Sequence, residues 1–160
     1  MLAKSEAEVT LTLPSDREIV FVREFERPSH RLFEAWTQPE HIRKWWGCEG
    51  STITECEIDL RVGGAWRLVM RMADGSENRF NGVYREIVLD ERLVYTECYE
   101  EPKYGSPEWL TTVTFEKIDG GTRLTHSILH RSREVRDGHL QAGMKEGTVQ
   151  MMNRLAAHTA

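Results

Sequence analysis

Residues 109–130 read WLTTVTFEKIDGGTRLTHSILH, and this stretch decides the fold. On both sides of residues 119–121 (DGG), apolar residues alternate with polar ones, which is the pattern of half-buried strands. The two glycines allow the positive φ angles that a tight hairpin turn needs. The stretch therefore predicts two antiparallel strands, over residues 109–117 and 122–130.

The same alternation continues toward the N-terminus. It predicts further strands over residues 18–26, 52–60, 64–72, 77–88 and 91–99. Turn residues separate them at positions 63–64 (GG), 74–75 (DG) and 90–91 (DE). We therefore expect the six strands from residue 52 onward to pair antiparallel, as a meander.

The segment between the first two strands predicts two short helices. Pro28 suits the first turn of one helix, whose apolar residues follow at helical spacing as far as Trp36. Residues 37–40 (TQPE) match a capping box, in which a Thr hydroxyl and a Glu carboxylate satisfy each other's backbone donors. A second helix is expected from this box to Gly47.

The chain returns to a helical period after residue 131. Ser132 is the expected cap of a charged segment, residues 133–141, that forms a separate turn before the main helix. The inner face of the long terminal helix consists of Met144, Thr148, Met151 and Leu155. This helix is the element available to cover the apolar face of the meander.

The expected fold class is α+β, a curved antiparallel β-sheet wrapped around a long C-terminal helix. Two short helices follow the first strand. A chain of 160 residues has the length of one domain. We expect residues 1–15 to be a flexible leader, in part a strand, and residues 16–160 to be a single domain.

Composition excludes several classes of function. The formal net charge is −5 and Lys and Arg are scattered singly, so no nucleic-acid partner is expected. No apolar run is long enough to span a bilayer, and charged residues occupy the start of the chain, so we expect a cytoplasmic protein without membrane insertion. The three cysteines and six histidines lack metal-ligand spacing, and we expect neither a metal nor a cofactor.

Five segments resemble a known family in their order and spacing. They are residues 23–28 (REFERP), 33–47 (FEAWTQPEHIRKWWG), 59–67 (DLRVGGAWR), 80–87 (FNGVYREI) and 120–125 (GGTRLT). Together they resemble bacterial homologues of the activator of heat-shock-protein ATPase, within the START-like (SRPBCC) superfamily. The resemblance implies a helix-grip, or Bet v 1-like, fold with a deep pocket. Superfamily members include lipid carriers, hormone receptors, aromatic-ring cyclases and co-chaperone domains.

Inward-facing side chains of the sheet and the helices are the candidates for lining such a pocket. They are Trp66, Leu68, Met70, Phe80, Tyr84, Tyr95, Val113 and Phe115 from strands, Trp36, Trp45 and Trp46 from the short helices, and Met144, Gly147, Thr148 and Met151 from the terminal helix. The same side chains also suit a packed core. Gly143 and Gly147 each cost about 1 kcal/mol relative to alanine inside a helix, which predicts a packing or ligand reason for them.

Two polar residues fall on the apolar face by alternation. His126 stands between Leu124 and Ile128, and Glu97 follows Tyr95 at the same spacing. We expect both to point inward as a pair that anchors the polar part of a ligand. The carboxylate would raise the histidine pKa against the effect of burial, so ligand affinity would depend on pH near neutrality. A bulge would instead turn either residue to solvent.

The leading hypothesis for function is binding of a small hydrophobic molecule, such as a lipid, a polyketide-like compound or an aromatic compound. One alternative is a cyclase- or hydrolase-like enzyme with His126 as general base, assisted by Glu97 or Tyr95. A co-chaperone that binds a chaperone is the alternative that the family resemblance implies. Edge strands of an incomplete sheet also favour a homodimer.

Overall fold

The computed structural model describes residues 8–160. Its elements, in chain order, are β1 (Thr10–Thr12), β2 (Glu18–Phe25), α1 (Ser29–Thr37), α2 (Pro39–Trp45), β3 (Thr52–Ile58), β4 (Ala65–Arg71), β5 (Glu77–Val88), β6 (Arg92–Tyr99), the 3₁₀ turn η2 (Pro102–Tyr104), β7 (Glu108–Ile118), β8 (Gly121–Leu129), α3 (Arg133–Gln141) and α4 (Met144–His158). The predicted strands agree with these bounds to within one or two residues.

The described strands form one antiparallel sheet in the order β1-β2-β8-β7-β6-β5-β4-β3. The strands from β3 to β8 are the predicted meander. The first long strand, β2, pairs with the last, β8, from Glu18 opposite Leu129 to Phe25 opposite Thr122. Of the leader expected over residues 1–15, residues 1–7 lie outside the described part, and residues 10–12 form β1 on the outer edge of β2.

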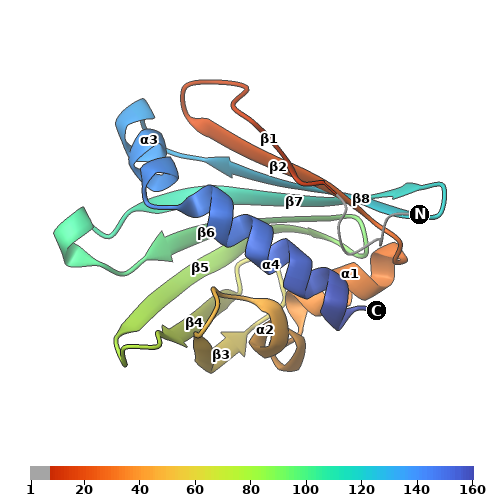
Figure 1. The fold of residues 1–160 in the computed structure, drawn as a ribbon, viewed down its shortest axis with the longest axis horizontal. Helices are drawn as coiled ribbons and strands as arrows, with labels where there is room; N and C mark the ends of the chain where they lie inside the picture. Colours follow the sequence, from red (N-terminus) through yellow and green to blue (C-terminus); the bar gives the residue numbers. More distant parts are fainter. Residues whose placement is uncertain (1–7) are drawn as a thin grey trace.

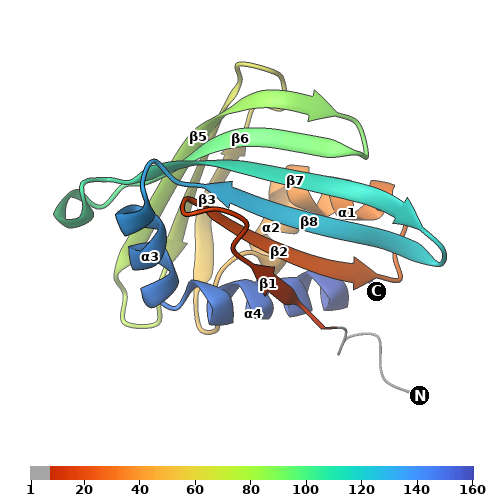
Figure 2. The same cartoon turned by 90° about the horizontal axis from the view of Figure 1, so that it is seen from above.

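The sheet curves around α4, which lies across its concave face (Figures 1 and 2). The pair α1–α2 stands at one end of α4, and α3 stands at the other end, beside the end of β8. This is the predicted helix-grip arrangement. Two register shifts interrupt the ladders between β3 and β6. One lies between Ile53 and Glu55 in β3, and the other lies between Tyr84 and Glu86 in β5. Such bulges bend a strand and increase its twist.

The main core lies between α4 and the concave face. Leu155 of α4 is completely buried and Met152 is 2% exposed, and both belong to the same cluster as Leu93, Val113 and Leu124 of the sheet. Strict alternation along β8 leaves Thr122, Leu124, His126, Ile128 and His130 buried. The period-two pattern of the sequence therefore describes which side chains face α4.

The capping box expected at residues 37–40 is wrong. Thr37 is the last residue of α1, and its hydroxyl donates to the Phe33 carbonyl at 2.8 Å instead of capping the next helix. The cap position of α2 is Gln38, whose backbone is extended, because a residue before proline avoids the helical region and Pro39 suits the first helical position. The cap expected at Ser132 is confirmed, since its hydroxyl accepts from the Val135 backbone N–H at 3.2 Å.

The two glycines near the start of the terminal helix differ in role. Gly143 does not lie inside α4: it has a φ of +89° and forms the joint between α3 and α4. Gly147 is helical, and a Cβ atom there would meet no atom within 4 Å apart from its own stretch of helix. The packing reason expected for Gly147 is therefore absent from this structure.

Gly147→Ala should raise the free energy of unfolding by about 0.5 to 1 kcal/mol, because alanine loses less backbone entropy than glycine inside a helix. Gly143→Ala is the matched control, and it should lower the free energy of unfolding by about 1 kcal/mol because its positive φ disfavours a side chain. Urea denaturation of both variants checks this. Equal shifts in the same direction would contradict the assignment of the two glycines.

Candidate functional site

A cavity of about 40 Å³ lies between α1–α2 and strands β3–β6. Its lining consists of Trp36 of α1, Ile42 and Trp45 of α2 with Trp46 directly after this helix, Cys56 and Ile58 of β3, Trp66 and Leu68 of β4, Tyr84 of β5, and Tyr95 and Glu97 of β6. This volume holds about three water molecules. The walls are mostly aromatic, and Glu97 supplies the carboxyl group.

Internal hydrogen bonds hold three of the tryptophan rings in place. The indole N–H of Trp36 donates to the Tyr95 hydroxyl at 3.1 Å, and that of Trp45 donates to the Ala35 carbonyl at 2.8 Å. The indole N–H of Trp66 donates to the Thr96 carbonyl at 3.1 Å. Buried indoles usually find such partners, and here the partners fix the orientation of the cavity walls.

Gly82 makes room for the Trp66 ring. It lies opposite Trp66 in the β4–β5 ladder, and the indole crosses β5 to reach β6. A Cβ atom at position 82 would lie 1.7 Å from the Thr96 carbonyl oxygen and 2.4 Å from the Trp66 indole nitrogen. A glycine in a strand often marks such a close approach. Gly82 therefore leaves space for a ring of the cavity wall, although Gly82 itself does not line the cavity.

Glu97 is a carboxylic acid held in a largely apolar place. Burial raises the pKa of Glu97 to about 7, and the Thr111 hydroxyl, which donates to its Oε1 at 3.2 Å, opposes this rise. The Trp109 indole also holds the pKa down, although its N–H falls outside hydrogen-bond geometry. Near neutral pH the group is therefore present both as acid and as carboxylate. Burial also raises the pKa of the Cys56 thiol to about 11, which keeps the thiol neutral.

His126 points inward as expected but does not pair with Glu97. In the β7–β8 ladder His126 lies opposite Val113, whereas in the β6–β7 ladder Glu97 lies opposite Trp109, so the two side chains belong to different rows of the sheet. The neighbours of His126 are the rings of Phe21 and Trp36. Burial without a carboxylate lowers the pKa of His126 to about 4. The pKa rise that we expected is wrong for this reason.

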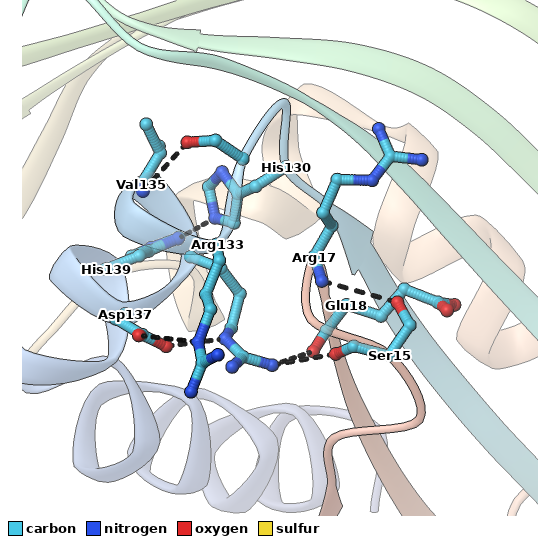
Figure 3. Close-up of polar contacts among 10 residues, drawn as sticks. Ser15, Arg17, Glu18, His130, Arg133, Val135, Asp137 and His139 are labelled. Atoms are coloured by element: carbon cyan, nitrogen blue, oxygen red, sulfur yellow. Dashed lines mark hydrogen bonds and ion pairs between the residues drawn. The ribbon is translucent and has the colours of Figure 1, made fainter.

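The row that contains Glu97 continues through Trp109 to His130. The Trp109 ring lies 5.3 Å from the His130 ring and 4.8 Å from the His139 ring of α3. Nε2 of His130 and Nδ1 of His139 are 2.8 Å apart (Figure 3). Alternation along β7 and β8 could have placed Trp109 and His130 inward, but the sequence contains no signal for the position of His139.

Arg136 attaches α3 to the start of the sheet. Its guanidinium donates to the Ser15 carbonyl at 2.8 Å and to the Asp137 carboxylate at 2.8 Å, and the residue is only 7% exposed. The labelled backbone segments of Ser15 and Glu18 face this end of α3 in Figure 3. The polar contacts of α3 therefore close the end of the sheet that lies away from α1 and α2.

Several residues predicted to line a pocket lie outside this cavity. They are Met70, Phe80, Val113, Phe115, His126, Met144, Gly147, Thr148 and Met151. Val113 and Phe115 belong to the main core, and Met144 and Met151 pack against it. No residue of α4 lines the cavity. Ile42, Cys56 and Ile58 line it and were not predicted, because their position depends on how α2 is placed over β3.

A family model described as "Activator of Hsp90 ATPase homolog 1-like protein" matches residues 26–160. The chain belongs to this family. No curated protein matches the chain.

Solved bacterial structures share the fold of this chain. A protein from Rhodobacter sphaeroides matches with a TM-score of 0.85 and 24% identity, covering 94% of this chain and 96% of the other. A protein from Nitrosomonas europaea gives a TM-score of 0.82 and 23% identity over 91% and 96% of the two chains. One from Arthrobacter aurescens gives 0.83 and 21% over 94% and 90%. At these identities the likeness concerns the fold.

Within residues 8–160, no helix is long and apolar enough to cross a membrane. The same residues contain no group of three or more His, Cys, Asp or Glu side chains placed to hold a metal ion.

In the parent protein, ionisation of Glu97 lowers the free energy of unfolding as pH rises. Glu97→Gln should remove this pH dependence. The folded pKa of about 7 lies above the unfolded value, so the stabilisation is present at low pH and disappears as pH rises through 7. We expect the variant to be about 1 to 2 kcal/mol more stable than the parent at pH 8 and similar to it at pH 5. Urea denaturation at both pH values measures this. Glu57→Gln, on the exposed side of β3, is the control and should leave the pH dependence unchanged.

His126→Leu should reduce the loss of stability in acid. The folded pKa of His126 lies below its unfolded value of 6.5, so stability falls as pH decreases from 6.5 toward 4. The substitution should remove about 2 kcal/mol of the loss between pH 7 and pH 5. Thermal or urea unfolding over this range tests the expectation, with the exposed His30→Leu as control. An identical pH profile for His126→Leu and the parent would show that His126 is accessible to protons in the folded state.

Proposed function

We propose that this protein binds a small, largely apolar molecule in the cavity between α1–α2 and β3–β6. The observation that supports this best is the composition of the walls. Aromatic rings, three of them held by indole hydrogen bonds, share the described lining with one carboxyl group. Apolar walls with few polar groups are the usual plan of a small-molecule site. Burial of apolar ligand surface would supply affinity of about 25 cal/mol per Å².

The walls must separate when a ligand of ordinary size enters. Ligand sites usually enclose several hundred Å³, whereas this cavity measures about 40 Å³. Strand walls are held by ladder hydrogen bonds, so the wall free to move is the end of α2 with Trp46. The Trp46 ring packs against the Phe80 ring of β5 at 5.1 Å, edge to face, and its displacement would widen the cavity.

The segment after Trp46 is attached to α4. Arg154 donates to the Gly47 carbonyl at 3.0 Å, and the Glu49 backbone N–H donates to the Gln150 side chain at 3.3 Å. Gly47 itself has a φ of +109°, a conformation in which glycine is favoured. A movement of Trp46 would therefore be transmitted to the middle of α4 through these two contacts.

Binding is favoured over catalysis by the position of His126. The enzyme hypothesis gives this residue the role of general base, which must lie within hydrogen-bond reach of the substrate. His126 does not line the cavity, and its ring is enclosed by Phe21 and Trp36.

An uncharged fluorescent probe, N-phenyl-1-naphthylamine, tests the proposal. We expect saturable binding with energy transfer from the tryptophans of the cavity. Leu68→Phe replaces an aliphatic side chain of the cavity wall by a larger, aromatic one. It should weaken binding by about ten-fold, which corresponds to about 1.4 kcal/mol. Val83→Phe is the matched control on the exposed side of β5 and should bind as the parent does. Equal affinity in all three proteins would place the probe elsewhere and contradict the proposal.

A further inference from the structure

We infer that the ligand carries a compact positive charge, such as a substituted ammonium group, that lies between the aromatic walls of the cavity and the Glu97 carboxyl group. This inference rests on the proposed binding function and names the chemistry of the ligand's polar end. Three features of the cavity support it: the hydrogen-bonding groups of the lining, the charge of the lining and the volume of the cavity.

The donors of the cavity lining are neutral groups: indole N–H groups and the hydroxyls of Tyr84 and Tyr95. The indole N–H groups of Trp36, Trp45 and Trp66 are already donated to protein oxygens. Their ring faces and edges remain as the surface that a ligand meets. A ligand whose polar end is an anion, such as a carboxylate or a phosphate, would find those three donors engaged. It would meet only neutral donors elsewhere in the described lining, with no positive charge to compensate the desolvation of its own charge.

The charge of the lining is negative or zero. Glu97 is the ionisable carboxyl group of the lining, and among residues 8–160 no Lys, Arg or His side chain lines the cavity. The Thr111 hydroxyl holds one carboxyl oxygen of Glu97 at 3.2 Å and so orients the group on β6. An arriving anion would meet a like charge, whereas a cation would meet an opposite one.

The aromatic walls favour a bound cation, as the carboxylate does. The faces of tryptophan and tyrosine rings attract cations, and this attraction grows when the cation is removed from water. Six of the lining side chains have such rings: Trp36, Trp45, Trp46, Trp66, Tyr84 and Tyr95. A carboxyl group beside several aromatic rings is the chemistry that recognises an organic cation.

A preference for cations also agrees with the raised pKa of Glu97. Burial raises its pKa to about 7, so the protein's own groups compensate the carboxylate poorly. A cation nearby would favour the ionised form. The cavity of about 40 Å³ suits a compact head group, with any larger apolar part of the ligand extending past the partly exposed Trp46 and Trp66.

Three probes of similar shape separate charge from size. Choline carries the cation, 3,3-dimethyl-1-butanol replaces its nitrogen by carbon, and 3,3-dimethylbutanoate carries a negative charge on a similar frame. Binding is measured at about pH 8 by calorimetry and tryptophan fluorescence, so that Glu97 is ionised. We expect choline to bind about ten-fold more tightly than the alcohol, and the anion to bind most weakly.

Two variants assign the preference to the site. Glu97→Gln should reduce choline affinity by about ten-fold and leave the alcohol unchanged, because it removes the charge and keeps the shape. Glu57→Gln removes an exposed carboxylate of β3, away from the cavity lining, and should behave as the parent. A choline preference that survives Glu97→Gln would overturn the inference.

The outcomes distinguish this inference from the proposed function. Alcohol binding equal to or tighter than choline binding would overturn the cation inference and leave an apolar site in place. Absence of binding for all three small probes would also overturn it. In that case the N-phenyl-1-naphthylamine titration, with its Leu68→Phe variant, decides separately whether the apolar site exists.

Discussion

Burial of the concave face of the sheet under α4 is the constraint on which the rest of the structure depends. An antiparallel sheet with one apolar face is stable only when another element covers that face. Leu155 and Met152 provide the cover, and both are almost completely buried. Because one helix cannot cover the whole curved sheet, α1–α2 close one end and α3 closes the other. The cavity lies at the end that α1–α2 close, between these two helices and strands β3–β6.

Local periodicity was enough to locate the long strands, the two short helices after β2 and the terminal helix. Alternation along β4 and β6 correctly placed Trp66, Leu68 and Tyr95 on the inner face, and the glycine-containing turns gave the order of the meander. The pairing of β2 with β8 could not be predicted in the same way, because it joins residues about a hundred positions apart and leaves no local pattern. The capping box failed because Pro39 dictates the backbone of Gln38 more strongly than the Thr37 hydroxyl does.

The composition of the site was less predictable than the fold. Alternation tells which face a residue occupies, but not which row of the sheet it joins. His126 and Glu97 share a face, yet the ladders place Glu97 with Trp109 and leave His126 among aromatic rings. Ile42 and Cys56 meet only because α2 lies over β3. Long-range placement of this kind is set by packing, which a single sequence does not display.

The pairing of β2 with β8 also has a consequence for the newly made chain. During synthesis β2 emerges early, with Ile19, Phe21 and Phe25 exposed, while its partner appears only when residue 129 has left the ribosome. Non-local pairing of this kind is slow to form, and an unpaired apolar strand can associate with other chains. The nascent protein therefore carries an exposed apolar strand until β8 has been made, and only then can β2 find its partner.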